Sequence, residues 1–174
     1  MNMKNIILYS LLFICCAGIL SSCEKDEITG TATEAMAGEW YVIADAIDAD
    51  GNVVYEDPFG NHHFHLDTYN TSGDGTSEMW IDDNENFWEF KNKININLSE
   101  LTFDATDAQN VTYDSKVTIK DGKILLGAAT TPSGMPADSI VFIVNFDDDT
   151  NPEDYGFESY RIAGIRYTGL TGDE

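Results

Sequence analysis

The sequence predicts an all-β fold of about eight to ten short strands in one domain, a barrel or a sandwich by its pattern, that follows a signal peptide and a short tether. Three observations favour this fold. After residue 38, apolar residues recur at every second position, which is the side-chain period of a strand. Turn-forming pairs such as Asp50-Gly51 separate these segments at short spacing. No long segment of the sequence has the period of an amphipathic helix, so the sheet must form the core by itself.

Strands are expected in the first half of the domain where this alternation is clearest. Trp40 and Val42 share one face with two alanines in the first strand, and Phe64 and Leu66 share one face of a later strand. In residues 87–98, the longest of these segments, apolar residues alternate with lysine and asparagine, so one face is buried and the other is solvated. These strands are residues 40–46, 53–55, 62–69, 78–82 and 87–98.

The second half of the domain repeats the pattern. Asp121-Gly122 lies between two alternating stretches and predicts a hairpin with a type I′ turn. Residues 128–138 are rich in proline and glycine and predict a loop, and the aspartates of residues 147–154 predict an acidic turn. The strands of this half are residues 101–104, 117–119, 124–126, 140–146 and 157–168.

The first 22 residues have the parts of a secretory signal peptide. Lys4 supplies a positive charge, and residues 6–20 form an apolar stretch that is too short to span a membrane comfortably. Leu20 and two serines precede Cys23, as at the cleavage site of bacterial lipoproteins. We therefore expect lipid attachment at Cys23. Several acyl chains at this residue would hold the protein firmly on a membrane. A transmembrane anchor and a plainly secreted protein are the alternatives.

This organisation divides the chain into three parts. Residues 1–22 are the signal peptide, residues 23–37 are the lipidated cysteine and its tether, and residues 38–174 are the barrel domain. Residues 24–27 (EKDE) resemble the acidic export signal that sends some Gram-negative lipoproteins to the outer face of the outer membrane. We therefore expect a lipid-anchored outer-membrane protein exposed at the cell surface, with the periplasmic face as the alternative.

The charge and the cysteines limit the partners and the source of stability. The net charge is −22, so phosphates are repelled and nucleic acid is excluded as a partner. Such acidity favours a soluble surface, with divalent cation binding as the alternative. Cys15 and Cys16 lie in the leader, so Cys23 is the only cysteine of the mature chain. The barrel must therefore be stable through its core alone.

Several motifs resemble a known family. In chain order they are Gly38-Glu39-Trp40-Tyr41-Val42, Thr68-Tyr69-Asn70-Thr71, Met79-Trp80-Ile81-Asp82-Asp83, Phe87-Trp88-Glu89-Phe90-Lys91, Thr131-Pro132-Ser133-Gly134, Asp138-Ser139-Ile140 and Gly164-Ile165-Arg166-Tyr167-Thr168-Gly169. Together they resemble the bacterial lipoproteins of the lipid-binding putative hydrolase family, which are lipocalin-like (calycin) proteins. The resemblance implies an eight-stranded barrel closed at one end by Trp40. It also implies that Arg161 or Arg166 of the last strand packs over this tryptophan.

Aromatic residues on the predicted strands supply a candidate ligand site. In a small barrel such rings either fill the interior or, as the resemblance implies, line a cup for one apolar ligand such as a lipid. The pattern by itself leaves both arrangements open. The candidate ligand-binding residues are Trp80, Trp88, Phe90, Phe142 and Phe146.

A catalytic site receives little support from the sequence. Serine catalysis needs a base beside the nucleophile and an oxyanion hole, and no G-x-S-x-G motif is present. Ser133 or Ser139 could pair with His63 or His65 and with Asp67, but no pattern places them together. We therefore predict no catalytic residues.

Metal and cofactor sites receive equally little support from the sequence. The two histidines of His63-x-His65 project from one strand face, but a third ligand is needed, so a polar outer face is favoured over a metal site. Asp147, Asp149 and Asn151 alternate oxygen ligands, although acidic turns more often cap their own backbone. We expect no metal and no cofactor.

The sequence thus predicts a lipid-anchored lipocalin-like barrel that binds a small hydrophobic ligand or lipid. Two alternatives remain. One is a lipid or ester hydrolase, and the other is a non-catalytic module with a filled barrel that takes part in a surface protein complex.

Overall fold

The computed structural model describes residues 30–174. The predicted signal peptide and the predicted lipid attachment at Cys23 lie outside the described residues. No helix within the described part of the chain is long and apolar enough to cross a membrane.

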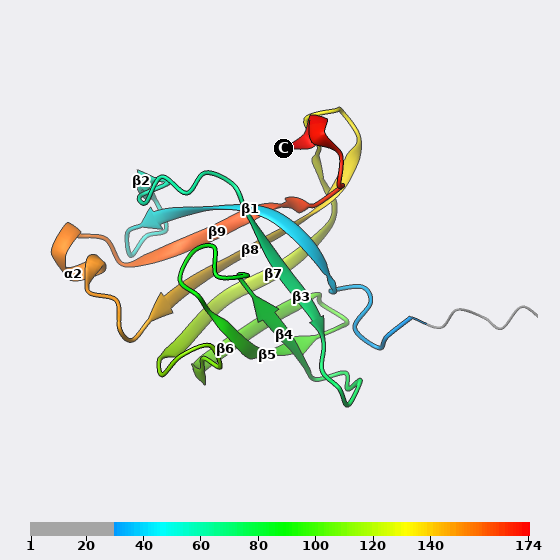
Figure 1. The fold of residues 1–174 in the computed structure, drawn as a ribbon, viewed down its shortest axis with the longest axis horizontal. Helices are drawn as coiled ribbons and strands as arrows, with labels where there is room; N and C mark the ends of the chain where they lie inside the picture. The colour runs from blue at the N-terminus through cyan, green and yellow to red at the C-terminus, as the bar shows by residue number, and fades with distance from the viewer. Residues whose placement is uncertain (1–29) are drawn as a thin grey trace, which may run out of the picture.

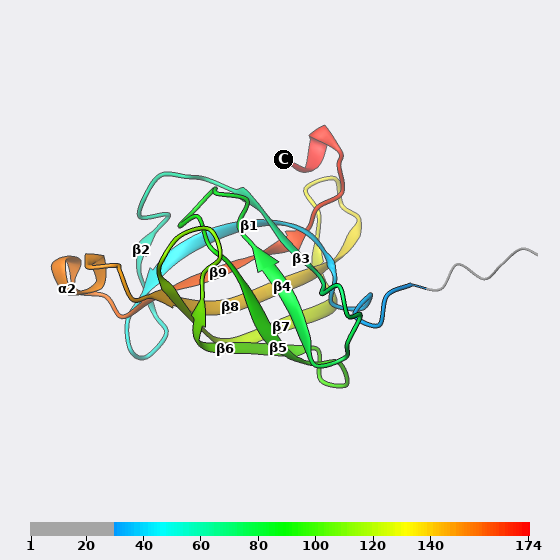
Figure 2. The same cartoon turned by 60° about the horizontal axis from the view of Figure 1, so that its bottom comes forward.

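Antiparallel strands form one sheet that closes on itself, which confirms the all-β prediction (Figures 1 and 2). From β3 to β9 each strand pairs with the next one along the chain, and β1 pairs with both β3 and β9 to complete an eight-stranded barrel. Among the described strands β2 pairs with β1 alone, so it lies outside the closed wall. The strands are β1 (Gly38–Ile47), β2 (Val53–Glu56), β3 (Phe64–Asn70), β4 (Glu78–Asp82), β5 (Lys91–Asn97), β6 (Thr102–Gln109), β7 (Lys116–Thr130), β8 (Pro136–Phe146) and β9 (Ser159–Arg166). Two short helices, α2 (Asn151–Tyr155) and η1 (Thr171–Asp173), flank β9.

Side chains that point inward from the strands fill the barrel. The predicted inner faces of β1, β3 and β8 are confirmed, because their alternate apolar residues are buried. Burying one such side chain contributes roughly 2 kcal/mol to folding, so this core can stabilise the barrel in place of disulfides. Inward residues with no exposed surface include Trp40, Val42, Leu66, Met79, Ile81, Phe90, Ile140, Phe142, Val144 and Ile162.

Closure of the barrel depends on a glycine in β9. Gly164 lies opposite Val42 of β1. A Cβ atom at position 164 would lie 2.1 Å from the carbonyl oxygen of Tyr41 and 2.6 Å from the Cα atom of Val42. Both are backbone atoms, so they could move only if the two strands separated. Glycine at this position therefore allows the first and last strands to pair.

The hairpin predicted at Asp121-Gly122 is wrong, because β7 runs continuously through both residues. Lys120 and Lys123 pair with residues of β8 that are separated by one residue, so two residues of β7 lie opposite one of β8. This arrangement is a β-bulge. A type I′ turn needs positive φ at both central residues, whereas here Asp121 has a φ of 53° and Gly122 does not have positive φ.

The two ends of the barrel differ. At the end that we call the Trp40 end, β1 begins and β9 ends (Figure 1). Met36, in the segment predicted as a tether, is 1% exposed and belongs to the core at this end, so this residue packs against the barrel. At the opposite end, which we call the aromatic end, β1 ends and β9 begins, and β2 and α2 lie beside them (Figure 1).

Candidate functional site

Trp40 closes its end of the barrel. Its side chain is fully buried, and the indole N–H donates a hydrogen bond to Oγ1 of Thr68 at 2.9 Å. The hydroxyl of Thr68 in turn donates to the carbonyl oxygen of Met36 at 2.7 Å. The guanidinium carbon of Arg166 lies 4.5 Å from the centre of the Trp40 ring, and Nη1 donates to the carbonyl oxygen of Ala37 at 2.8 Å. A cation–π contact and a chain of hydrogen bonds therefore hold this plug in place.

Of the two arginines that the resemblance singles out, Arg166 packs over Trp40 and Arg161 does not. The strand register places Arg166 opposite Trp40 and Arg161 opposite Asp45. Side chains of paired residues lie on the same side of a sheet. Asp45 points outward, between two buried alanines, and its carboxylate lies 3.0 Å from Nη2 of Arg161. Arg161 therefore forms an ion pair on the outer wall.

Aromatic rings gather at the opposite end of the barrel. The ring of Tyr160 is central, with ring centres 5.2 Å from Phe87 and 5.7 Å from Phe59. Trp88 stacks on Phe146 at 5.2 Å and 16°. We call these five side chains the mouth cluster. Because the rings contact one another, they form a continuous apolar surface across this end of the barrel.

The loop between β4 and β5 carries Phe87 and Trp88 into the mouth cluster, and Asp83 organises it. The buried carboxylate of Asp83 accepts the backbone N–H groups of Glu85 at 3.0 Å, Phe87 at 3.1 Å and Trp88 at 2.7 Å. Burial nevertheless raises the pKa of Asp83, because it disfavours the charged form more than these hydrogen bonds favour it. The prediction of a strand over residues 87–90 is wrong, because these bonds hold the chain in a loop and β5 begins only after it.

The acidic turn after β8 holds the mouth cluster from its other side. Asp148 accepts the indole N–H of Trp88 at 3.2 Å and the hydroxyl of Tyr113 at 2.9 Å. Asp149 accepts the hydroxyl of Tyr160 at 2.8 Å. Burial and this carboxylate raise the pKa of Tyr160 far above its usual range, so the hydroxyl keeps its proton and donates. Two aspartates of this turn thus position three rings.

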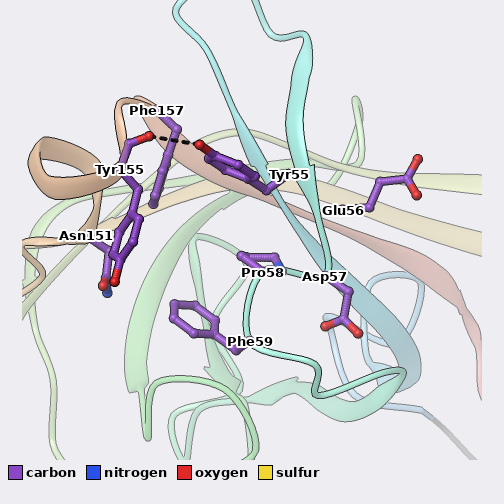
Figure 3. Close-up of a pocket in the computed structure, with 8 residues that line it drawn as sticks. All are labelled: Tyr55, Glu56, Asp57, Pro58, Phe59, Asn151, Tyr155 and Phe157. Carbon is purple, nitrogen blue, oxygen red and sulfur yellow. Dashed lines mark hydrogen bonds between the residues drawn. The ribbon is translucent and has the colours of Figure 1, made fainter.

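A pocket of about 420 Å³ opens beside the mouth cluster (Figure 3). Phe59 belongs to both, because it lines the pocket and also packs on the other rings of the cluster. The hydroxyl of Tyr55 donates to the carbonyl oxygen of Tyr155 at 3.2 Å, which ties β2 to α2 across the pocket wall. The lining residues are Tyr55, Glu56, Asp57, Pro58, Phe59, Asn151, Tyr155 and Phe157.

Four of the five predicted ligand-binding residues lie in or next to the barrel interior. Phe90 and Phe142 have no exposed surface, and their rings lie 5.5 Å from Phe146 and 5.7 Å from Phe103, respectively. Trp88 and Phe146 belong to the mouth cluster. The rings that point inward therefore pack on one another, and the pocket lies beyond them.

Trp80 is placed differently from this prediction, because it faces outward. Its neighbours in β4, Met79 and Ile81, are fully buried, so the alternation of the strand directs Trp80 to the outer wall. The ammonium of Lys93 lies over its ring at 5.7 Å. Residues 79–81 are all apolar, so the sequence alone does not show which of them point into the barrel. The pairing of β4 with its neighbouring strands decides this.

Residues 25–171 match the protein family described as "lipid-binding putative hydrolase". The chain belongs to this family. The match includes the Trp40 end, the mouth cluster and the pocket. Lipid binding is therefore supported by both the family and the barrel fold. No curated protein matches the sequence closely enough to count as a relative.

The hydrolase in the family's description raises the question of a catalytic serine. The hydroxyl of Ser139 donates to the carbonyl oxygen of Gly164 at 2.8 Å, and Ser133 bonds to a neighbouring threonine hydroxyl at 2.9 Å. Nδ1 of His65 lies 2.8 Å from the carboxylate of Glu39. Within residues 30–174 neither serine is hydrogen-bonded to a histidine, so these residues do not assemble a nucleophile and its base.

The histidine row of β3 interacts with aromatic and acidic neighbours. The ring of His63 stacks on Tyr41 at 5.0 Å, and the ring of His65 meets Tyr167 edge-on at 4.6 Å. Among the described residues, no group of three or more histidine, cysteine, aspartate or glutamate side chains is arranged to hold a metal ion.

Carboxylates of the acidic turns accept backbone N–H groups. Asp147 accepts a backbone N–H of β7 at 2.7 Å, and Asp149 accepts the backbone N–H of Asn151 at 2.9 Å. In the turn after β1, Asp48 accepts the side-chain amide of Asn52 at 3.1 Å and its backbone N–H at 2.8 Å, and these hydrogen bonds lower the pKa of Asp48. Asp149 and Asp48 therefore cap their own turns, whereas Asp147 links its turn to β7.

Proposed function

We propose that this protein is a lipid-anchored protein of the outer membrane and that it binds a hydrophobic or amphiphilic lipid at the aromatic end of its barrel. The observation that carries lipid binding is the pocket beside the mouth cluster. It joins a continuous surface of aromatic rings to an opening with polar groups. An amphiphile needs both kinds of surface, one for its chain and one for its head.

The loop over residues 57–63 is the element that would admit the chain of the lipid. Phe59 is 41% exposed, although its ring packs on the mouth cluster. The backbone of this loop has positive φ at Asp57, Gly60 and His62. Because this loop lies outside the paired strands, we expect it to open at lower cost than the barrel wall. In the proposed complex the loop moves and the acyl chain takes the place of Phe59 on the mouth cluster.

Replacing Phe59 by alanine tests this arrangement. We expect a lysophospholipid to bind about tenfold more tightly, because the ligand no longer displaces a ring whose burial is worth roughly 1–2 kcal/mol. A change in tryptophan fluorescence, to which Trp88 of the mouth cluster contributes, reports binding in the full chain carrying Cys23→Ala, which has no acyl chains of its own. Leu126→Ala, at a residue that is 60% exposed on β7, is the control. If lysophospholipid binds neither the protein that keeps Phe59 nor the Phe59→Ala variant, the lipid site is refuted.

The anchor is tested separately. Replacing Cys23 by alanine removes the predicted acceptor thiol, so the protein should leave the membrane fraction, because the hold on the bilayer comes from the acyl chains. Cell fractionation followed by immunoblotting measures this, and protease treatment of intact cells reports exposure at the surface. Retention of Cys23→Ala protein in the membrane fraction would contradict the anchor but would leave the lipid site untouched.

The packed interior favours a second candidate function. A barrel whose inward rings contact one another can serve as a rigid module for binding another protein. Native mass spectrometry of the full chain carrying Cys23→Ala separates the two candidates. Co-purified lipid supports the lipid site, whereas the mass of the protein alone favours the interaction module.

A further inference from the structure

We infer that the pocket at the aromatic end recognises a quaternary ammonium group of the choline type. This inference rests on the proposed lipid site and names the chemistry of the ligand's head. Three aromatic rings, a local excess of negative charge and the absence of a basic lining residue carry it.

The rings come from three separate elements. Tyr55 lies on β2, Tyr155 ends α2, and Phe157 lies in the segment between α2 and β9. Figure 3 shows the three side chains around one side of the pocket. Tyr55 and Tyr155 are 45% and 64% exposed. Within the described part of the chain the ring of Tyr155 stacks on no other ring, so its faces are open to a ligand.

The hydrogen bond from the hydroxyl of Tyr55 to the carbonyl oxygen of Tyr155 keeps β2 close to α2. The ring of Tyr55 also meets that of Phe157 edge-on, with centres 6.5 Å apart. The pocket is thus formed before a ligand arrives. A methylated ammonium group is attracted to the faces of such rings, and the attraction grows when the group is partly desolvated.

The charges around the pocket select the same kind of ligand. Glu56 and Asp57 are the acids among its eight lining residues, which include no lysine or arginine, and the carboxylate of Asp57 also accepts the backbone N–H groups of Asn61 and His62. α2, which lines the pocket with Asn151 and Tyr155, also carries Glu153 and Asp154. Arg161, on the neighbouring strand β9, is paired with Asp45 and offers little charge to a ligand.

The chain as a whole carries a net charge of −22, which attracts cations and repels anions. A carboxylate or phosphate head on its own would therefore meet no counter-charge in the pocket. A quaternary ammonium suits the site better than a primary one, because its methyl groups contact the rings and it needs no hydrogen-bond acceptors. The pocket volume of about 420 Å³ leaves room for the atoms that join this group to the rest of a ligand.

Titration calorimetry with choline and with its neutral isostere 3,3-dimethylbutan-1-ol tests the inference in the full chain carrying Cys23→Ala. The two probes have the same shape and differ in charge. We expect choline to bind about tenfold more tightly than the isostere, from the cation–π contribution. Tyr155→Ala should weaken choline binding about tenfold, whereas Tyr155→Phe, which keeps the ring, should retain it. Trp80→Ala, which removes a ring from the outer wall, is the matched control.

Equal affinity for choline and the isostere, or unchanged choline binding in Tyr155→Ala, overturns the inference. Lysophosphatidylcholine carries the quaternary ammonium group and lysophosphatidylglycerol does not. Comparing the two lipids tests whether the ammonium group belongs to a lipid and whether the proposed lipid site stands. Preference for the choline lipid supports both proposals. Equal binding of the two lipids overturns the ammonium site and leaves the lipid site standing. Binding of choline without either lipid supports a site for a free quaternary ammonium compound and overturns the lipid site.

Discussion

Replacing Trp40 by alanine will lower the free energy of unfolding by about 4 kcal/mol, because it leaves a large cavity at the end of a barrel that has no disulfide. The change also removes the ring beneath the guanidinium of Arg166 and the donor to Thr68. Chemical denaturation followed by circular dichroism measures the loss. Trp80→Ala removes an indole ring from the outer wall instead, and it should lower the free energy of unfolding by about 1 kcal/mol.

Trp40→Phe separates the two contributions. It restores most of the buried ring but not the indole N–H, so about half of the stability lost in Trp40→Ala should return. Equal losses of stability in Trp40→Ala and Trp80→Ala would show that the Trp40 end is not the plug described above.

The second large effect is expected at Asp83. Asp83→Ala should lower the free energy of unfolding by about 3 kcal/mol, because three backbone N–H groups lose a common acceptor and two of them, at Phe87 and Trp88, belong to the mouth cluster. Trp88 should become more exposed, which a red shift of tryptophan fluorescence and faster quenching by acrylamide would report. Unchanged fluorescence would mean that the loop keeps its form without this carboxylate.

The raised pKa of Asp83 gives this site a pH dependence of known sign. The folded protein holds the Asp83 proton to a higher pH than the unfolded chain, whose carboxyl has the ordinary pKa of 3.8. The contribution of this group to stability is therefore greatest below that pKa and falls as the pH rises from 3.8 through the folded-state value. Asp83→Asn cannot titrate, so its stability should lack this component when the two proteins are compared over the same acidic range. Identical pH profiles would contradict the assignment.

The alternation of apolar and polar residues was enough to predict most of the strands and their inner faces. It did so because the side-chain period of a strand is a local property that each segment expresses by itself. Trp40, Val42, Phe64 and Leu66 are buried as predicted. Where the local signal had two meanings, the prediction was wrong. Asp121-Gly122 has the composition of a hairpin turn, and only pairing with β8 made it a bulge.

The candidate site was less predictable. Trp88 and Phe146 stood out as aromatic residues on expected strands, but Phe59 and Tyr155 lie outside such strands and gave no periodic signal. Their role comes from β2 and α2, which are far apart in the sequence and meet beside β9. The sequence did not distinguish Arg161 from Arg166, because the register of β9 on β1 decides which of them reaches Trp40.

The sequence by itself thus determined an acidic, all-β domain, because composition and side-chain period act within each segment, and the closed barrel with its tryptophan plug was implied by the resemblance to the family. The tertiary structure alone decided which rings meet inside the barrel, where the pocket opens and which charges surround it. Those features depend on contacts between residues 28 to 100 positions apart, such as Trp40 with Thr68 and Tyr55 with Tyr155. No local pattern encodes the distance between such segments, so only the closed barrel brings them together.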